Sequence, residues 1–300
     1  MRIVALLLVL SAPWAFSQEP AAPVHGSSNL TQRVQAPSYS DMYCSGFISK
    51  QGFPAANYVA AGAESPNQTQ FRQTDVLFLD GTGYTEGARL SVIRPLRDPN
   101  RSRAYPTQAA SIAALGQPYA DLGRVRVTAL RGKMAIAVVE FSCSPIVPGD
   151  LVTPFEEKPP VAYRPKTEFE RFPAAASSVT ARIVMAKDFD YLVGAGQKVY
   201  ISAGADKGVK VGDYFRAVRN YDPAKMDAVD ALSLRVPQSE ETQQYGTELS
   251  KAKYAELPRR AVAEMIVLNV TPTSSTALVT YSVENIIVGD TVELEGGGSQ

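Results

Sequence analysis

The chain of 300 residues carries 30 basic and 30 acidic side chains, so its formal net charge at pH 7 is zero, and 45% of its residues are hydrophobic. This balance excludes the surplus of Lys and Arg with which nucleic-acid-binding proteins neutralise phosphates. The single histidine disfavours a His-based metal site or catalytic triad, and the length predicts about two domains.

Residues 1–17 have the organisation of a secretory signal peptide. Arg2 supplies a short positive region, an apolar run follows at residues 3–10, and small residues precede an expected cleavage point after Ser17. A transmembrane anchor needs about 20 apolar residues, and Pro13 interrupts this run. We therefore expect an exported protein, in the periplasm or associated with the outer membrane, with no transmembrane segment after signal cleavage.

The next segment, residues 18–42, is rich in Pro, Ser, Ala and Gln and has few large aliphatic side chains. Such a composition buries too little apolar surface to offset the entropy lost on ordering. It therefore predicts a flexible leader. His25 lies in this leader and is interpreted as a solvated side chain rather than as a metal ligand or a catalyst.

Internal similarity indicates that the remainder of the chain is a duplication. The stretch FSCSPIVPGDLV at residues 141–152 returns as YSVENIIVGDTV at residues 281–292. Two further similarities lie upstream in the same order, residues 119–124 with 254–259 and, more weakly, residues 76–79 with 199–202. Three matches in one order predict two related units.

The duplication sets the expected domain boundaries. The first unit spans residues 43–154 and the second spans residues 179–294. Residues 155–178 between them contain several prolines, which break helices and strand ladders, so we expect a semi-extended Pro-rich linker. Residues 295–300 are expected to form a flexible tail.

Each unit is expected to consist of about five or six short strands. In the first unit, residues 124–130 alternate polar and apolar side chains, and Gly132 precedes a second strand at residues 135–141, which is typical of a hairpin. The strands predicted in the second unit are residues 198–204, 214–219, 263–270 and 276–283.

Each unit also contains a longer excursion between strands. In the second unit this is residues 220–258, with a short helix near residues 247–257, and in the first unit residues 107–115 form the equivalent helical turn. Together these features predict a mainly β fold of two tandem related small β-barrel domains with short helical excursions. An open sandwich-like arrangement is the competing architecture.

Three Gly-Asp pairs recur between strand-like stretches, at Gly149-Asp150, Gly212-Asp213 and Gly289-Asp290. A carboxylate in such a position could bind a metal ion. However, Gly supplies a positive φ and Asp bonds nearby backbone amides in turns, and the alternating acidic spacing of a calcium loop is missing. We interpret the three pairs as structural turns.

The two cysteines, Cys44 and Cys143, are expected in the opening strand and near the last strand of the first unit. An even pair in an exported chain predicts a disulfide. Closing a loop of this length contributes roughly 4 to 5 kcal/mol in the chain-entropy model. Strand alternation through Ala137, Val139 and Phe141 predicts an inward-pointing Cys143. The alternative is two reduced, buried thiols.

No pattern typical of an active site occurs in the sequence. Gly81-Thr82-Gly83 lacks the Lys-Ser/Thr ending of a phosphate-binding loop, and no Ser lies in a GxSxG context. We therefore predict no catalytic residue, no cofactor and no metal site. The strand tyrosines could either pack in the sheets or form a sugar-stacking face; they are Tyr200, Tyr214, Tyr221 and Tyr281.

The second unit resembles a known family. Val199-Tyr200-Ile201, the GVKVGD stretch at residues 208–213 and the IIVGDTV stretch at residues 286–292 are similar to the C-terminal domain of flagellar assembly protein T. Related β-barrel units occur in exported bacterial proteins with lysin-motif peptidoglycan-binding domains. The first unit is more loosely similar, since Ala88 follows Gly87 where Asp is expected. The resemblance implies a Gram-negative envelope component without catalytic residues.

The sequence thus predicts a non-enzymatic exported protein that serves as a scaffold or interaction module in periplasmic or outer-membrane assembly. Its expected partners are other envelope proteins, because the loops of duplicated scaffolds are where partner choice diverges. The alternative is a protein that binds peptidoglycan or another polysaccharide through strand faces that carry tyrosines. No nucleic-acid partner is expected.

Overall fold

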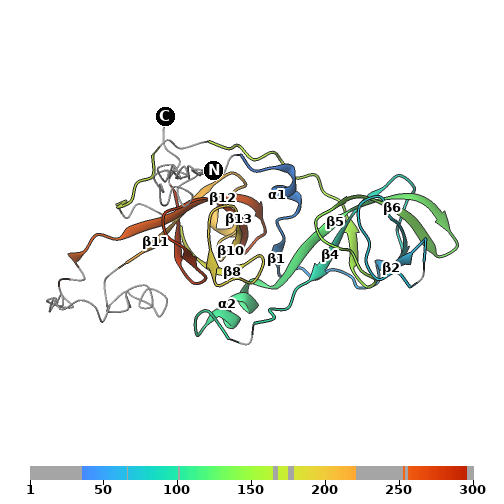
Figure 1. The fold of residues 1–300 in the computed structure, drawn as a ribbon, viewed down its shortest axis with the longest axis horizontal. Coiled ribbons are helices and arrows are strands. Elements are labelled where there is room, and N and C mark those ends of the chain that lie inside the picture. The colour runs from blue at the N-terminus through green and yellow to red at the C-terminus, as the bar shows by residue number, and fades with distance from the viewer. Residues whose placement is uncertain are drawn as a thin grey trace, which may run out of the picture.

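The computed structural model describes residues 36–65, 67–100, 102–164, 168–174, 179–220, 253 and 256–295. The predicted signal peptide, His25 and most of the predicted leader lie outside the described residues. The fold is mainly β, as predicted, and its two larger sheets close into two barrels of six strands each (Figure 1). An open sandwich is therefore wrong.

Barrel 1 is closed by the pairing of β5 with β6, which joins the two ends of the ring β5-β4-β7-β2-β3-β6. Its strands are β2 (Tyr58–Gly62), β3 (Val76–Asp80), β4 (Arg89–Pro95), β5 (Gln117–Arg131), β6 (Met134–Ser142) and β7 (Leu151–Pro154). Alternate side chains of these strands point inward, so that Leu77, Leu79 and Val125 are fully buried in the core of the barrel.

Barrel 2 has the ring order β12-β11-β15-β8-β10-β13. Its strands are β8 (Thr180–Ala186), β10 (Lys198–Ile201), β11 (Tyr214–Arg219), β12 (Arg260–Val270), β13 (Ser275–Ser282) and β15 (Thr291–Leu294). Two short strands, β9 (Leu192–Val193) and β14 (Ile286–Ile287), pair beside the ring, and a 3₁₀ turn, η1 (Ala205–Lys207), follows β10. The strands of the two barrels correspond in chain order and pair in the same pattern, so that β5 corresponds to β12 and β6 corresponds to β13.

Hydrogen bonds relate the two barrels residue by residue. The Gly149 amide donates to the Val59 carbonyl and the Gly289 amide donates to the Ile183 carbonyl, each at 2.8 Å. The carbonyl of Leu122 accepts from two successive amides that begin at Cys143, and the carbonyl of Val262 accepts from the matching amides that begin at Val283. Residues 141–152 and 281–292 therefore occupy equivalent positions.

The two shorter sequence matches do not pair residues that are structurally equivalent in the two barrels. Because Leu122 corresponds to Val262, residues 119–124 of β5 match the start of β12, whereas residues 254–259 lie before that strand. In the weaker match, Leu77 lies opposite Ala137 and Val199 lies opposite Ala277, so Leu77 rather than Val76 corresponds to Val199. Ladder pairing fixes the true register, which short letter matches cannot reveal.

Three elements outside the rings lie between the barrels or against barrel 2 (Figure 1). They are α1 (Tyr39–Tyr43), β1 (Phe47–Ser49) and α2 (Gln108–Leu115). The helix expected at residues 107–115 is thus α2, while most of the helix expected near residues 247–257 lies outside the described residues. In the part of the chain that the structure describes, no helix is long and apolar enough to cross a lipid bilayer.

The expectation of a flexible leader up to residue 42 is not met at its end, where α1 forms. Ser38 caps this helix: its hydroxyl accepts a hydrogen bond from the Asp41 amide at 3.1 Å, and Asp41 accepts from the Ser38 amide at 2.9 Å. Asp41 also pairs with Lys198 of β10 at 2.7 Å. The cap and this ion pair give the segment contacts that its composition does not suggest.

Candidate functional site

The two barrels are joined through β1, which belongs to neither ring. Its residues Phe47 and Ser49 pair with Tyr119 and Gln117 at the start of β5, ahead of the part of β5 that enters barrel 1. Ile48 points the other way and is fully buried. It belongs to an apolar cluster drawn from both units, made of Ile48, Leu115, Val184, Met185 and Tyr200.

Hydroxyl groups on barrel 2 hydrogen-bond to the backbone that docks on it. Thr276 donates to the Gly46 carbonyl at 2.8 Å, and Ser274 donates to the Ile48 carbonyl at 2.9 Å. Thr273 donates to the last carbonyl of α2 at 3.1 Å. These bonds satisfy backbone groups that would otherwise be buried without partners, so the docking of β1 and α2 is specific rather than merely apolar.

The connection between β4 and β5, residues 96–116, reaches across to barrel 2. Gln108 of α2 donates to the Val184 carbonyl at 3.0 Å. Tyr105 is 4% exposed and packs into the core of barrel 2, where the Arg182 guanidinium lies 5.4 Å from its ring centroid. Asn100 donates to the Phe189 carbonyl at 2.8 Å. This connection of barrel 1 therefore contributes to the core of barrel 2.

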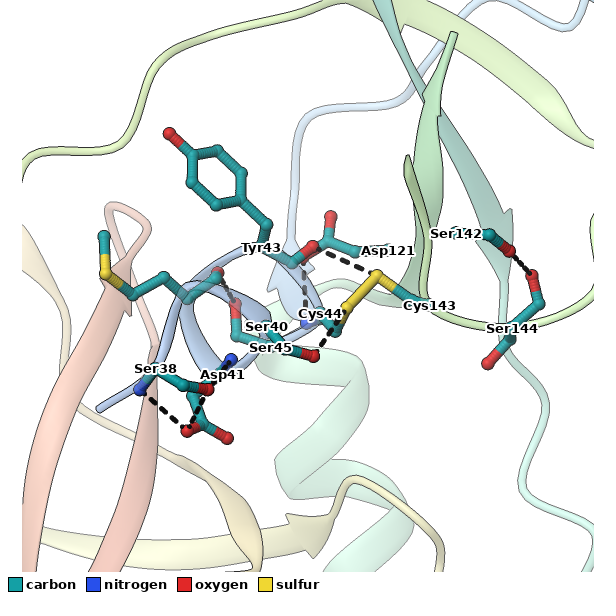
Figure 2. The surroundings of a disulfide bond; sticks show 12 residues. Ser38, Ser40, Asp41, Tyr43, Cys44, Ser45, Asp121, Ser142, Cys143 and Ser144 are labelled. Carbon is teal, nitrogen blue, oxygen red and sulfur yellow. Dashed lines mark hydrogen bonds between the residues drawn. A yellow bond between two sulfur atoms is a disulfide. The ribbon is translucent and has the colours of Figure 1, made fainter. Parts of the chain in front are cut away.

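The predicted disulfide is present and lies at this junction (Figure 2). Cys44 and Cys143 are joined with their Cα atoms 5.5 Å apart. Cys44 is the C-cap of α1 rather than part of a strand, and Cys143 follows the end of β6. The bond therefore ties the helix that docks on barrel 2 to the wall of barrel 1.

Cys143 does not continue the inward face of β6, as strand alternation had suggested. Arg124 lies opposite Phe141, but the next residue of β5, Val125, lies opposite Val139, so one residue of β6 is skipped by a bulge. Beyond the bulge, the ring of Phe141 lies 5.3 Å from that of Tyr39 in α1. The bulge thus directs the end of β6 towards α1.

Lys158 of the predicted linker connects three segments next to the disulfide. Its ammonium donates to the Met42 carbonyl at 2.8 Å and to the Ser45 hydroxyl and the Asp121 carboxylate at 3.2 Å each. Asp121 also accepts from the Gly46 amide at 3.0 Å. The charge of Lys158 is therefore balanced inside the junction, where it holds α1, β1 and β5 together.

The described parts of the predicted linker, residues 155–164 and 168–174, run along barrel 2. Tyr214 of β11 accepts a hydrogen bond from the Arg164 amide at 2.9 Å and donates one to the Arg164 carbonyl at 3.0 Å. The Ala261 amide donates to the Arg171 carbonyl at 2.7 Å. These parts of the predicted linker are hydrogen-bonded to barrel 2.

The Gly-Asp turns have one geometry. The glycines have φ values of 93°, 91° and 114°, in chain order, which only Gly adopts readily. Each Asp accepts a hydrogen bond from the amide three residues earlier, at 2.7 to 2.8 Å. Among the described residues, no group of three or more His, Cys, Asp or Glu side chains could hold a metal ion.

Two of these aspartates bind an arginine that the sequence analysis did not single out. Arg94 donates through Nε and Nη2 to Asp150 at 2.7 and 2.8 Å, and Arg219 donates to Asp290 in the same way at 3.0 and 2.8 Å. Each arginine lies at or next to the end of its strand, seven residues after Gly87 or Gly212. That shared spacing is the signal that could have found them.

In barrel 2, further charged side chains surround the pair formed by Arg219 and Asp290. Glu284 accepts hydrogen bonds from Arg219 at 3.0 Å, from Arg260 at 3.1 Å and from Arg171 of the linker. Burial raises the pKa of Glu284, but Arg260, Arg171 and Arg219 outweigh it and hold the pKa below its ordinary value. The equivalent residue of barrel 1 is Ser144, so this arrangement is not needed for the fold.

Arg219, Arg260 and Glu284 line an open pocket of about 390 Å³ at the end of barrel 2. Its wall is formed by Leu192, Arg219, Arg260, Ser282, Val283, Glu284, Asn285 and Ile287. We call it the arginine pocket. Beside the pocket, the guanidinium groups of Arg171, Arg219 and Arg260 pair with Glu284, and Arg219 also pairs with Asp290.

The strand tyrosines do not share an exposed face. Tyr200 is fully buried at the junction, and its burial raises the pKa of its hydroxyl far above the ordinary value. Tyr214 is bonded to the linker, and Tyr281 packs its ring 5.1 Å from that of Phe169. Tyr221 lies outside the described residues.

Comparison of the chain with protein-family models and with curated proteins finds no match.

Proposed function

We propose that this protein is a non-enzymatic component of the bacterial envelope that serves as a rigid scaffold or interaction module. The observation that carries the proposal is the junction. A buried apolar cluster joins the first unit to barrel 2, while the disulfide and Lys158 hold α1 and β1, the segments that dock there, against barrel 1.

A junction of this kind restricts the movement of the two barrels relative to one another. Domains of one chain usually move relative to one another unless their interface is large and apolar. Here Tyr105 and Ile48 of the first unit are buried against barrel 2, and α1 is bonded covalently to barrel 1. Fixing two barrels at one angle is useful when their loops must meet partners in a set geometry, which is the task of a scaffold.

The charged side chains of the described residues support this proposal rather than catalysis. Lys158 is neutralised by Asp121, Lys198 by Asp41, and Arg94 by Asp150. Catalytic groups, in contrast, are usually held in clefts with their reactive atoms directed at a substrate. These pairs instead join one segment of the chain to another, which is a structural role.

The N-terminal sequence and the disulfide support a proposed site of action outside the cytoplasm. A signal peptide directs export, and a disulfide persists in oxidising compartments such as the periplasm. The resemblance of the second unit to the C-terminal domain of flagellar assembly protein T belongs to the same proposal. We therefore propose a location in the periplasm or at the outer membrane, with envelope proteins as partners.

Crosslinking in living cells followed by mass spectrometry tests the scaffold proposal. A photo-crosslinker at Leu192, which is 56% exposed beside the arginine pocket, is expected to capture one or a few defined envelope proteins. The matched control carries the crosslinker at Gly52 on a loop of the first unit. Recovery of only abundant, unrelated proteins from both positions would overturn the proposal.

The arginine pocket favours one second candidate, the binding of peptidoglycan or another anionic polysaccharide. Guanidinium groups such as those of Arg219 and Arg260 in its wall bind the carboxylates that such polymers carry. Cosedimentation of the mature protein with purified sacculi separates the two functions, because a scaffold with only protein partners stays in the supernatant. If the pocket binds the polymer, Arg260→Gln lowers the pelleted fraction, whereas Arg131→Gln on the exposed hairpin of barrel 1 leaves it unchanged.

A further inference from the structure

The outer wall of barrel 2 at β10 and β13 is covered by elements of the first unit. Tyr200 on this wall lies beneath Ile48 and Leu115, and Thr276 beside it is bonded to the backbone that precedes β1. The segment that provides α2 is the connection between β4 and β5. In short, a connection of one barrel docks on the wall of the next barrel.

The equivalent wall of barrel 1 is apolar and half-exposed in the described structure. By the strand correspondence, Phe78 occupies the position of Tyr200, and Ile136 occupies the position of Thr276. Side chains that point outward from β3 and β6 form what we call the β3–β6 wall, made of Val76, Phe78, Met134, Ile136 and Val138. Their inward neighbours, such as Leu77 and Ala137, are fully buried.

Basic side chains border the β3–β6 wall. Arg89 and Arg126 are 54% and 50% exposed, and both share the single carboxylate of Glu140 with Arg124. Exposed Arg131 and Lys133 stand at the hairpin next to Met134. Asp75, Asp80 and Glu86 are further acidic side chains of this region, so that with Glu140 four acidic side chains stand against these five basic ones.

Barrel 2 has a connection at the place where barrel 1 carries α2. It joins β11 to β12, and residues 221–252 of it lie outside the described residues. This stretch contains six acidic and three basic side chains, together with apolar residues such as Val229, Leu232 and Leu234. Its charge and its apolar side chains complement the β3–β6 wall.

The β5–β6 hairpin beside the wall and the described ends of the connection lie at opposite ends of the molecule. Figure 1 shows the hairpin of β5 and β6 at one end of the long axis, while β11 ends and β12 begins at the other. One molecule cannot easily bring the two together, but two molecules placed in line can. The contact would be heterologous, since different surfaces of the two copies meet.

We propose that the β3–β6 wall binds the β11–β12 connection of a second copy of this chain, so that the protein associates head to tail. The contact between copies repeats the contact inside the chain: each barrel receives a connection from the barrel before it. This goes beyond the scaffold proposal, because a scaffold could act as a single molecule. The association remains open-ended unless its rotation closes a ring.

Sedimentation velocity of the mature protein, residues 18–300, tests this proposal. The weight-average sedimentation coefficient is expected to rise with protein concentration and to fall with added salt, because salt screens the complementary charges. Phe78→Lys is expected to weaken association by about tenfold or more. Phe172→Ser is the control, since Phe172 is 59% exposed but lies on the linker, away from the wall.

A mixing experiment then distinguishes a head-to-tail contact from others. A variant in which residues 225–250 are replaced by a short Gly-Ser linker keeps the wall but loses the connection, while Phe78→Lys keeps the connection. Each alone is expected to be monomeric, and their mixture is expected to give a one-to-one dimer and nothing larger.

Several results would overturn the proposal. They are a monomer at every concentration, self-association that persists in both variants, and a mixture that stays monomeric. Should circular dichroism show that Phe78→Lys does not fold, Ile136→Lys replaces it with the same expectations. If deletion of residues 18–35 exposes an association that the full mature chain lacks, the leader rather than a second copy covers the wall.

Discussion

Gly46 directly precedes β1, and its carbonyl accepts a hydrogen bond from Thr276 of barrel 2. Its φ is +67°, and an added Cβ would overlap the hydroxyl oxygen of Tyr200 and lie 2.9 Å from the Tyr119 carbonyl oxygen. Gly46→Ala is therefore expected to lower the free energy of unfolding by about 2 kcal/mol or more, because strain and overlap both occur at a junction that cannot relax.

Urea unfolding measures this effect, and Gly52→Ala provides the matched control. Nothing lies within 4 Å of an added Cβ at Gly52, and its φ is not in the left-handed region. The control should change the free energy of unfolding by less than about 0.5 kcal/mol. Equal effects of the two substitutions would show that Gly46 is not a point of close approach between the units.

Glu284 links the stability of barrel 2 to pH. Its pKa in the folded protein is below its ordinary value of 4.5, because the three arginines around it outweigh the effect of burial. A depressed folded pKa contributes stability that is present above the unfolded pKa and is lost as the pH falls through the folded pKa. Glu284→Gln should therefore destabilise the protein at pH 7, and the difference from wild type should shrink below about pH 4.5.

Thermal unfolding monitored between pH 7 and pH 3 tests this expectation. Glu64→Gln, a substitution at an exposed loop position of the first unit, is the matched control and should follow the wild-type curve. A difference between Glu284→Gln and wild type that stays constant over this range would contradict the role given to the arginines.

At the scale of elements, the disulfide connects α1 to the end of β6. It closes a loop with a sequence separation of 99 residues. The double substitution Cys44→Ser and Cys143→Ser is expected to lower the free energy of unfolding by roughly 4 kcal/mol in the chain-entropy model. Reduction of the wild type should have the same effect on urea unfolding, and a reductant should leave the double variant unchanged. An unaltered unfolding curve of the double variant would count against the bond.

The β4–β5 connection stabilises the barrel to which it does not belong. Tyr105→Ala removes a buried ring from the core of barrel 2, so a loss of about 3 to 5 kcal/mol is expected. Hydrogen exchange should become faster at amides of β8 and β10. Phe172→Ala, which truncates an exposed ring, is the control. Faster exchange confined to barrel 1 would contradict the placement of Tyr105.

Much of each barrel could be predicted from local sequence. The strand expected at residues 214–219 is β11 with the same bounds, and α2 lies where a helical turn was expected. Period-2 alternation and the turn chemistry of Gly-Asp are local properties, so short windows reveal them. The closure of the ring by β5 and β6 also follows from the predicted hairpin.

The junction could not be predicted in the same way. The docking of Ile48 and Tyr105 depends on tertiary contacts, and polar or short segments such as residues 36–49 give no periodic signal of it. The bulge opposite Arg124 changes the direction of Phe141 without leaving a trace in the alternation of side chains. The arginine pocket depends on Arg171, Arg219, Arg260 and Glu284, which are far apart along the chain and meet only in the folded barrel.

At the scale of the whole molecule, a net charge of zero conceals an uneven distribution. The border of the β3–β6 wall in barrel 1 is basic, whereas residues 221–252 of barrel 2 have twice as many acidic as basic side chains, six against three. The excess charges of the two halves thus have opposite signs. A molecule of this kind is electrically neutral and still able to bind a second copy through its ends.

Differential scanning calorimetry of the mature protein tests whether the two barrels form one rigid body. If the junction couples the barrels, one transition is expected, with a calorimetric enthalpy close to the van't Hoff enthalpy. Gly46→Ala should shift that whole transition to lower temperature. Two resolved transitions in the wild type, or a shift of only one part of the heat-capacity curve in the variant, would contradict the claim.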